Sequence, residues 1–236
     1  MRKILCSLWL SLVATLSHAG PTADDMVMAA KMGDVSVLRE GTASGFDPNY
    51  TDRQGNTLLI HAAANSNAAA VDVLLKAGAK PETRNRSGDD ALNYGAIKGN
   101  LDIVQALVAR GLPVTRKQGW QPLTYAVLGK NMAVFNYLLK QGADPNGNNP
   151  NQASALMFAA QQGQEEMVDR LLAAGADPTW TKGSESAVDW ALQNQNTDIA
   201  EKIMKAQAAQ GFSRSEVLKD DGSEEETSET VESPVK

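Results

Sequence analysis

Few residues of this chain have the types and spacing that catalysis or metal binding requires. The chain contains two histidines and one cysteine, and beyond residue 19 only His61 remains of these. An acid–base or nucleophile–histidine mechanism would have to be built around this imidazole and nearby carboxylates. A zinc site needs more histidine or cysteine ligands, and no loop has the alternating acids and turn glycine of a calcium site. We therefore expect no enzyme, metal or cofactor, and keep an enzyme built around His61 as an alternative.

The position of His61 in a periodic series favours a structural role for its ring. At intervals of about one repeat the same position holds Met28, His61, Tyr94, Tyr125, Phe158 and Trp190. The other members are apolar or aromatic, so this series predicts a stripe that packs in the core. We therefore expect the imidazole of His61 to be packed and hydrogen-bonded. The aromatic residues of the series are expected to belong to the core rather than to a cofactor site. Burial of the His61 ring would argue against the catalytic alternative.

Residues 154–179, SALMFAAQQGQEEMVDRLLAAGADPT, define the unit that is repeated. Ser154 can cap a first helix, because its hydroxyl accepts a hydrogen bond from an unpaired amide of the first turn. Gly163 interrupts the helical pattern, and Gly175 ends a second apolar stripe with the left-handed conformation common after helices. Two such short helices cannot bury their apolar faces on each other alone, so the unit needs neighbouring copies.

Copies of this unit recur along most of the chain. The small residue of the first helix recurs at intervals of 33, 33, 31, 33 and 32 residues, as Ala29, Ala62, Gly95, Ala126, Ala159 and Ala191. The glycine after the second helix recurs as Gly45, Gly78, Gly111, Gly142 and Gly175. Helix starts fit this register at Asp24, Thr57, Asp90, Ser154 and Ser186, with Gln121–Pro122 as the exception. The connection from Gly111 to Gln121 is two residues shorter than its equivalents, which predicts a shortened loop.

This period and these motifs resemble the ankyrin repeat. The motif residues include TLLIHAA (57–63), QPLTYAV (121–127), SALMFAA (154–160), LLKQGADPN (138–146) and LLAAGADPT (171–179). The resemblance implies an all-α solenoid of about six helix-turn-helix units with short β-hairpin loops, here called fingers. The expected units span about residues 23–52, 53–85, 86–115, 116–149, 150–180 and 181–210, within a domain of residues 20–210. The first and last units are more polar, as terminal repeats with one solvent-facing side should be.

The two ends of the chain have a different character. Arg2 and Lys3 precede an apolar run of 13 residues and the small-residue pattern Ser17-His18-Ala19, which predicts a removable export signal over residues 1–19. Residues 211–236 are expected to form an acidic, disordered tail, with eight acids against two lysines from residue 216 onward. The 13 apolar residues are too few to span a bilayer, and the scarcity of cysteine favours a bacterial periplasm.

The resemblance also implies where a partner would bind. Ankyrin proteins are expected to hold partners against the finger tips and the inner helix face. Cations occupy four of the five tips here, where the chain has Arg53, then Arg84 and Arg86, then Arg116 and Lys117, and finally Lys182. The groove positions add apolar side chains, so the expected partner-binding residues are Arg53, Arg86, Ile97, Lys117, Trp120, Leu128 and Lys182. The alternative is that these loops are merely polar and solvated, since Asp52 and Asp89 lie nearby.

These residues predict a non-catalytic protein-interaction module whose partner is acidic at its contact surface. Nucleic acid is not expected, because without its two ends the domain carries a slight net negative charge. Similarity to exported bacterial ankyrin proteins implies one of two roles: support of an oxidative-stress enzyme such as catalase, or immunity to a delivered toxin. The acidic tail is expected to contact the basic fingers of its own molecule.

Overall fold

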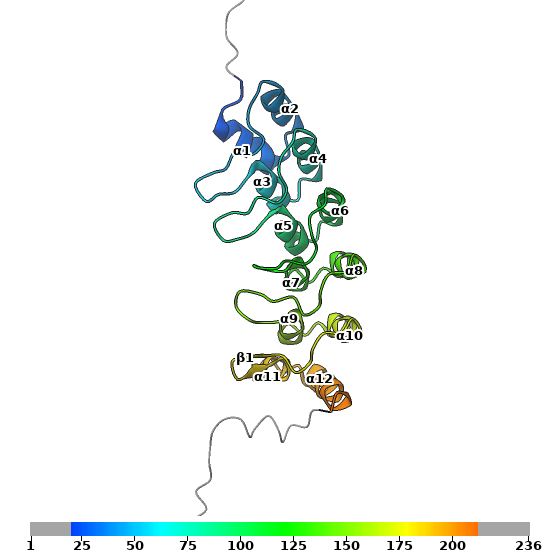
Figure 1. Cartoon of the computed structure of the whole chain (residues 1–236). Helices are drawn as coiled ribbons and strands as arrows, with labels where there is room; N and C mark the ends of the chain where they lie inside the picture. The colour runs from blue at the N-terminus through cyan, green and yellow to red at the C-terminus, as the bar shows by residue number, and fades with distance from the viewer. Residues whose placement is uncertain (1–19, 212–236) are drawn as a thin grey trace, which may run out of the picture.

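The computed structural model describes residues 20–211, which form six helix pairs stacked in one row (Figure 1). The helices are α1 (Ala23–Met32), α2 (Val35–Ala43), α3 (Leu58–Ala64), α4 (Ala68–Lys76), α5 (Ala91–Lys98), α6 (Leu101–Ala109), α7 (Pro122–Leu128), α8 (Met132–Lys140), α9 (Ala155–Gln161), α10 (Glu165–Ala173), α11 (Ala187–Gln193) and α12 (Thr197–Ala209). The odd-numbered helices form the layer beside the fingers, and the even-numbered helices form the outer layer (Figure 1). The predicted export signal and nearly all of the predicted tail lie outside the described residues.

The odd-numbered helices begin largely where the sequence predicts. The side chains of Thr57, Asp90, Ser154 and Ser186 all accept hydrogen bonds from first-turn amides, and Pro122 occupies the first position of α7. The prediction for Asp24 is wrong, because Thr22 caps α1 and Asp25 completes a capping box with it. Asp24 instead lies in the first turn of α1, where a negative charge is favourable to the helix dipole.

The even-numbered helices start at a second periodic series, which also connects neighbouring repeats. The side-chain amides of Asn67, Asn100, Gln164 and Asn196 donate hydrogen bonds to backbone carbonyls at the end of the preceding repeat's first helix or in the turn directly after it. Asn67, for example, donates to the carbonyls of Ala30 and Lys31. Some of these carbonyls also accept a backbone amide of the following turn, as Val127 does from Lys130, so the side-chain amides add a second hydrogen bond there. The series therefore stabilises each helix end and fixes the stacking of the repeats.

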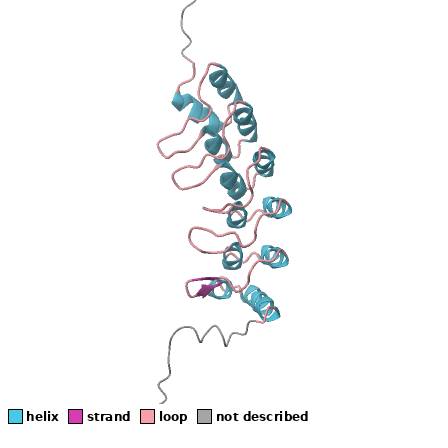
Figure 2. Cartoon of the chain, in the orientation of Figure 1, coloured by secondary structure: helices cyan, strands magenta, loops and turns pink. Residues whose placement is uncertain are grey.

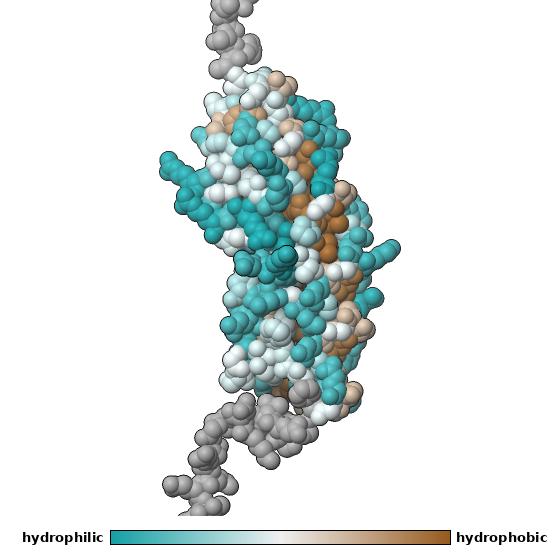
Figure 3. Space-filling model, in the orientation of Figure 1, coloured by the Kyte–Doolittle hydropathy of each residue, from teal (hydrophilic) through white to brown (hydrophobic). Residues whose placement is uncertain are grey.

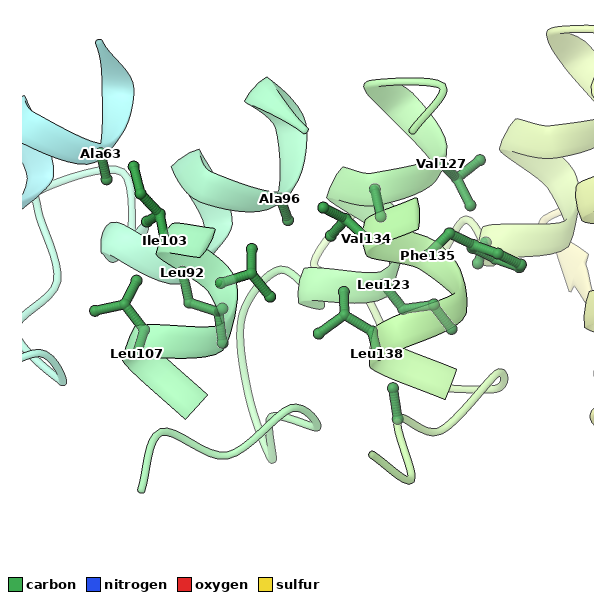
Figure 4. Close-up of a cluster of buried hydrophobic side chains, with 14 of the residues drawn as sticks. Ala63, Leu92, Ala96, Ile103, Leu107, Leu123, Val127, Val134, Phe135 and Leu138 are labelled. Atoms are coloured by element: carbon green, nitrogen blue, oxygen red, sulfur yellow. The ribbon is translucent and has the colours of Figure 1, made fainter. Parts of the chain in front are cut away.

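The hydrophobic core runs without interruption between the two helix layers. Leu74, Leu107, Leu138 and Leu171 are fully buried at equivalent positions of successive outer helices. In the middle of the stack, Leu92 and Leu123 of the inner layer face Leu107 and Leu138 of the outer layer (Figure 4). Each repeat therefore completes the apolar interior of its neighbour.

The predicted buried stripe holds at every repeat except the first. His61 and Trp190 are buried, and Tyr94, Tyr125 and Phe158 are half-buried and pack against the core. Met28 is 57% exposed and Met32 is 74% exposed, so the core prediction for Met28 is wrong. The physical reason is its place in the terminal repeat, where no preceding repeat covers that side of α1.

Glycine permits two different features of the stack. At Gly142, φ is 84°, a left-handed conformation in which the chain leaves α8 for the next finger. At Gly129, φ is ordinary, but an added Cβ would overlap the backbone oxygen of Ile97. This glycine therefore allows the end of α7 to approach α5 closely.

The fingers are loops rather than regular hairpins, except for the last one. Strands β1 (Thr181–Lys182) and β2 (Glu185–Ser186) form the two-stranded antiparallel sheet seen in Figure 2. In the first finger, Thr51 and Thr57 form an isolated bridge. The finger before α7 projects less than its neighbours (Figure 1), in line with its two missing residues. Across residues 20–211, no helix combines the length and apolar character needed to cross a bilayer.

Candidate protein-interaction site

The five fingers, formed by the loops before α3, α5, α7, α9 and α11, are joined side by side by hydrogen bonds. The first two meet where the Asn85 amide donates to Asn56 Oδ1 at 2.9 Å and the Arg86 backbone amide donates to the Gln54 carbonyl at 3.1 Å. Further contacts between fingers are Arg84 Nη1 to the Gln118 carbonyl, Gln121 Nε2 to the Asn148 carbonyl, and Trp180 Nε1 to the Gln152 carbonyl. The fingers therefore form a connected surface rather than five independent loops, which lowers the entropy lost on binding.

Three of the predicted cations point outward from this surface. Arg53, Arg86 and Lys117 are exposed on the first, second and third fingers, and within residues 20–211 no carboxylate forms an ion pair with them. Figure 3 shows hydrophilic residues covering the loops that project beside α3 and α5. We refer to Arg53, Arg86 and Lys117 as the finger cations.

The neighbouring acids turn away from the finger cations. Asp52 accepts hydrogen bonds from Gln54, Asn56 and His61, and its carboxylate lies against the base of the first finger. Asp89 is buried and accepts hydrogen bonds from Asn93 and from the Tyr125 hydroxyl, the latter at 2.6 Å. Both carboxylates accept hydrogen bonds from groups on the inner side of the fingers. They therefore do not neutralise the finger cations by direct contact.

Arg116 does not belong to the exposed set, contrary to its prediction as a tip cation. Its side chain is turned inward, the residue is 7% exposed, and its guanidinium pairs with the Asp90 carboxylate, which also caps α5. Burial raises the pKa of Asp90, while the charge of Arg116 and the backbone amides of Asn93 and Leu92 oppose this effect. The third finger is two residues shorter than its equivalents, so its backbone lies closer to the stack and Arg116 reaches the neighbouring repeat.

Gln121 holds the same short finger from the other side. Its side-chain oxygen accepts from the Arg116 amide at 2.8 Å, and its Nε2 donates to the carbonyls of Arg116 and Asn148. The backbone amide of Gln121 donates to Asn149 Oδ1. Gln121 therefore does not cap α7 through its side chain, but fixes the loop from which Lys117 projects.

An aromatic row lies beside the finger bases in the last three repeats. The ring centroids of Trp120 and Phe158 are 6.3 Å apart, and those of Phe158 and Trp190 are 5.4 Å apart. Trp120 is half-buried, as are the two other predicted groove residues, Ile97 and Leu128. The accessible part of Trp120 lies in the finger that carries Lys117, so a charge and an aromatic surface occur on one loop.

Lys182 differs from the other predicted cations. Its ammonium lies 5.4 Å from the centre of the Trp190 ring, in cation–π geometry, and Glu185 is its partner in the β1–β2 register. Glu185 also accepts a hydrogen bond from Trp190. Lys182 is half-buried, and its ammonium already has these contacts within its own finger. Its charge is therefore less accessible to a partner than the charges of the finger cations.

His61 is packed and hydrogen-bonded at the base of the first finger, as predicted. The residue is 8% exposed, and its Nε2 lies 2.9 Å from Asp52 Oδ2. Burial lowers the pKa of His61, and the neighbouring Asp52 carboxylate partly opposes the change. Burial acts to raise the pKa of Asp52, but its hydrogen bonds outweigh that effect and lower it. The ring is thus placed to orient the finger rather than to meet a substrate.

Among residues 20–211, no three His, Cys, Asp or Glu side chains are grouped as metal ligands. The titratable groups with strongly altered pKa values serve the fold instead. Burial, together with the Asp89 hydrogen bond, raises the pKa of Tyr125 far above its ordinary value, so its hydroxyl stays protonated as a donor. The sequence contained no clear signal that Asp89 would be bound from the next repeat, although the 36-residue separation from Tyr125 is near one repeat.

The stacked helix pairs, the connected fingers and the cations with an adjoining indole define a repeat scaffold of the protein-binding class. The chain belongs to the ankyrin-repeat family: the family model "Ankyrin repeats (3 copies)" matches residues 26–118, 83–149 and 123–212. Among curated proteins, it is 29% identical to the ankyrin-repeat protein YahD of Escherichia coli K12, covering 64% of this chain and 96% of YahD. It also matches the tyrosine-protein kinase Shark of Drosophila melanogaster at 30% identity, but spans only 21% of that protein.

Solved structures show the same architecture. The ankyrin repeat domain of human ASB11 has a TM-score of 0.71 at 20% identity, with 80% of this chain and 88% of that chain covered. A chain of the complex between the predatory endopeptidase Bd0816 from Bdellovibrio bacteriovorus and the immunity protein Bd3460 matches with a TM-score of 0.67 at 25% identity. That match covers 76% of this chain and 96% of the matched chain. These structures support the predicted ankyrin-repeat solenoid.

Proposed function

We propose that this protein is a non-catalytic, exported interaction module that works in the bacterial periplasm. It binds an acidic surface of another protein through the finger cations, with Trp120 as an aromatic anchor and Ile97 and Leu128 completing the groove. The charges speed and orient encounter, and the partly exposed indole supplies the apolar contact that slows dissociation.

The observation that carries this proposal is the opposite orientation of neighbouring charges on the fingers. Asp52 and Asp89 are held inward by His61, Asn93 and Tyr125, whereas Arg53, Arg86 and Lys117 remain exposed. A set of merely solvated loops would not require the acids to be bound from inside. This arrangement keeps positive charge on the contact side of a domain whose overall charge is slightly negative.

An immunity-type role is the second candidate, and one comparison favours it. A chain of the complex between the endopeptidase Bd0816 and the immunity protein Bd3460 shares this fold over 96% of its length. By analogy, this chain would cover an exported peptidase or another toxic enzyme and prevent its activity. Support of an oxidative-stress enzyme such as catalase, which the family resemblance implied, is the alternative identity of the partner. An enzyme built around His61 is disfavoured by the burial of the ring.

Affinity capture from periplasmic extract tests the proposed surface. The baits are residues 20–236, a variant with Arg53, Arg86, Lys117 and Trp120 changed to Ala, and a matched variant with Arg39, Lys140, Lys205 and Met32 changed to Ala. The second set lies on exposed positions of the helices and removes the same charge and one apolar side chain. We expect the wild type and the helix variant to capture one shared partner that the finger variant loses.

Equal capture by all three baits would overturn the surface assignment. Circular dichroism melting of each bait shows that the variants are folded. The captured protein then separates the candidate roles: a peptidase whose turnover is blocked by the bait supports immunity. A catalase whose activity survives oxidant or heat better with the bait supports the stress role.

A further inference from the structure

The central part of the solenoid is positively charged although the domain is not. Between Lys76 and Lys140 the sequence has ten lysines and arginines against four acids, and two of these acids, Asp89 and Asp90, are buried. From residue 141 to residue 211 it has four lysines and arginines against nine acids. An acidic polypeptide is therefore attracted to the middle repeats and repelled by the last two.

The chain itself ends in such a polypeptide. Residues 216–236 contain eight acids, two lysines and few apolar side chains. A segment of this composition lacks the apolar surface needed to form a core of its own. Its charge is opposite to that of the middle repeats and to that of the finger cations.

The described structure ends where this segment can reach the fingers. In each earlier repeat the chain leaves the outer helix through a glycine with positive φ and then enters a finger, as at Gly142 and Gly175. Gly211 has the same conformation, with φ of 88°, directly after α12. The 13-residue α12 is four residues longer than the 9-residue α10, so the chain leaves α12 through the same kind of turn about one helical turn, or roughly 6 Å, beyond the equivalent point.

The length of the remaining chain is sufficient for this contact. Stacked helices lie about 8–10 Å apart, so the third finger is roughly 30 Å from the end of α12 and the first finger roughly 50 Å. The sequence has 25 residues after Gly211, and a flexible chain of that length would have a root-mean-square span of about 28 Å. Fully extended they span about 85 Å, so contact with Lys117 needs no stretching and contact with Arg86 or Arg53 remains within reach.

We infer that residues 216–236 bind the finger cations of their own molecule and act as an internal competitor for the acidic partner. This inference rests on the proposed binding surface and adds the first occupant of that surface. Tethering raises the local concentration of the tail to the millimolar range, so weak contacts suffice to occupy the site. Since exposed ion pairs are weak and screened by salt, a partner that also binds Trp120 displaces the tail.

A spin label on the tail tests this contact in the protein expected after export, residues 20–236. This chain has no cysteine, so Ser223→Cys provides a single attachment site for a nitroxide. We expect selective broadening of backbone amide NMR signals in the second and third fingers at about 20 mM salt, and its loss at about 0.5 M. Signals near Lys140 on the outer layer serve as the internal reference.

Two variants and one control make the test specific. Changing the eight tail acids to Gln or Asn should abolish the broadening, and this change does not touch the folded domain. The triple variant Arg53→Ala, Arg86→Ala and Lys117→Ala should reduce it about tenfold, judged by the relaxation rate. The matched triple variant Arg39→Ala, Lys140→Ala and Lys205→Ala should leave it unchanged.

Absence of finger broadening, or equal broadening with the neutralised tail, would overturn the inference. Such a result would leave the proposed function standing if capture of the partner still depended on the finger residues. Conversely, tail contact without any finger-dependent capture would support the internal contact and count against the external partner.

Discussion

At the scale of single residues, His61 shows how an ionisable group serves the fold. Its ring occupies the position that Tyr94, Tyr125 and Phe158 fill in later repeats, and it adds a hydrogen bond to Asp52 that these residues cannot make in the same way. Asp52 in turn accepts hydrogen bonds from the backbone amides of Gln54 and Asn56, and these bonds shape the first finger. Protonation of this buried ring should therefore destabilise the part of the fold near the finger that carries Arg53.

The pH dependence of unfolding measures this effect. The pKa of His61 is lowered in the folded protein, whereas in the unfolded chain it is about 6.5. Below pH 6.5 the unfolded chain binds more protons, so the free energy of unfolding falls as the pH is lowered from about 7.5 to about 5.5. Urea unfolding at several pH values should show this slope in the wild type and a flatter one in His61→Gln, which does not titrate. Equal slopes in both proteins would contradict the account.

At the scale of elements, the short third finger shows why charged loop residues are hard to assign from sequence. Arg116 and Lys117 are adjacent cations, yet Lys117 is exposed and Arg116 is buried against Asp90 of the preceding repeat. The two missing residues of this loop were visible in the spacing, but their consequence depends on the path of the backbone. The pair connects the third finger to the start of α5.

Breaking this pair should cost much more than removing its neighbour. Arg116→Ala leaves Asp90 buried without its partner, which should lower the free energy of unfolding by about 3–5 kcal/mol. Lys117→Ala removes an exposed cation and should change it by less than about 0.5 kcal/mol. The double variant Asp90→Asn with Arg116→Met should recover most of the loss, since Asn still caps α5 and Met fills the space. Similar urea midpoints for Arg116→Ala and Lys117→Ala would show that the buried pair does not form.

The helices were more predictable from sequence than the contacts between them. The 33-residue period located all six helix pairs, because apolar spacing and cap residues are local signals. The residues directly before the outer helices, Asn67, Asn100, Gln164 and Asn196, were overlooked although they recur with the same period and bind the preceding repeat. Inward rotation of Asp52 and Asp89 could not be predicted, because it depends on donors that the fold brings together from separate elements.

At the scale of the whole molecule, stacking explains both stability and the separation of charge. Each repeat buries its apolar face on its neighbours, so the polar loops carry little of the core and are free to differ in charge. The methionines of α1, at the start of the stack, are exposed, and the last repeats are acidic. The positive contact region is therefore formed by the central fingers. We propose that this region, rather than the outer helices, meets the partner.

Photo-crosslinking in living cells is the most direct measurement of that claim. A photoreactive amino acid replaces Lys117 on the third finger in one strain and Lys140 on the outer helix α8 in another, and both positions are exposed. We expect illumination to produce a defined heterologous adduct from position 117 and little or none from position 140. An adduct from position 140 with none from position 117 would contradict the assignment of the fingers as the binding surface.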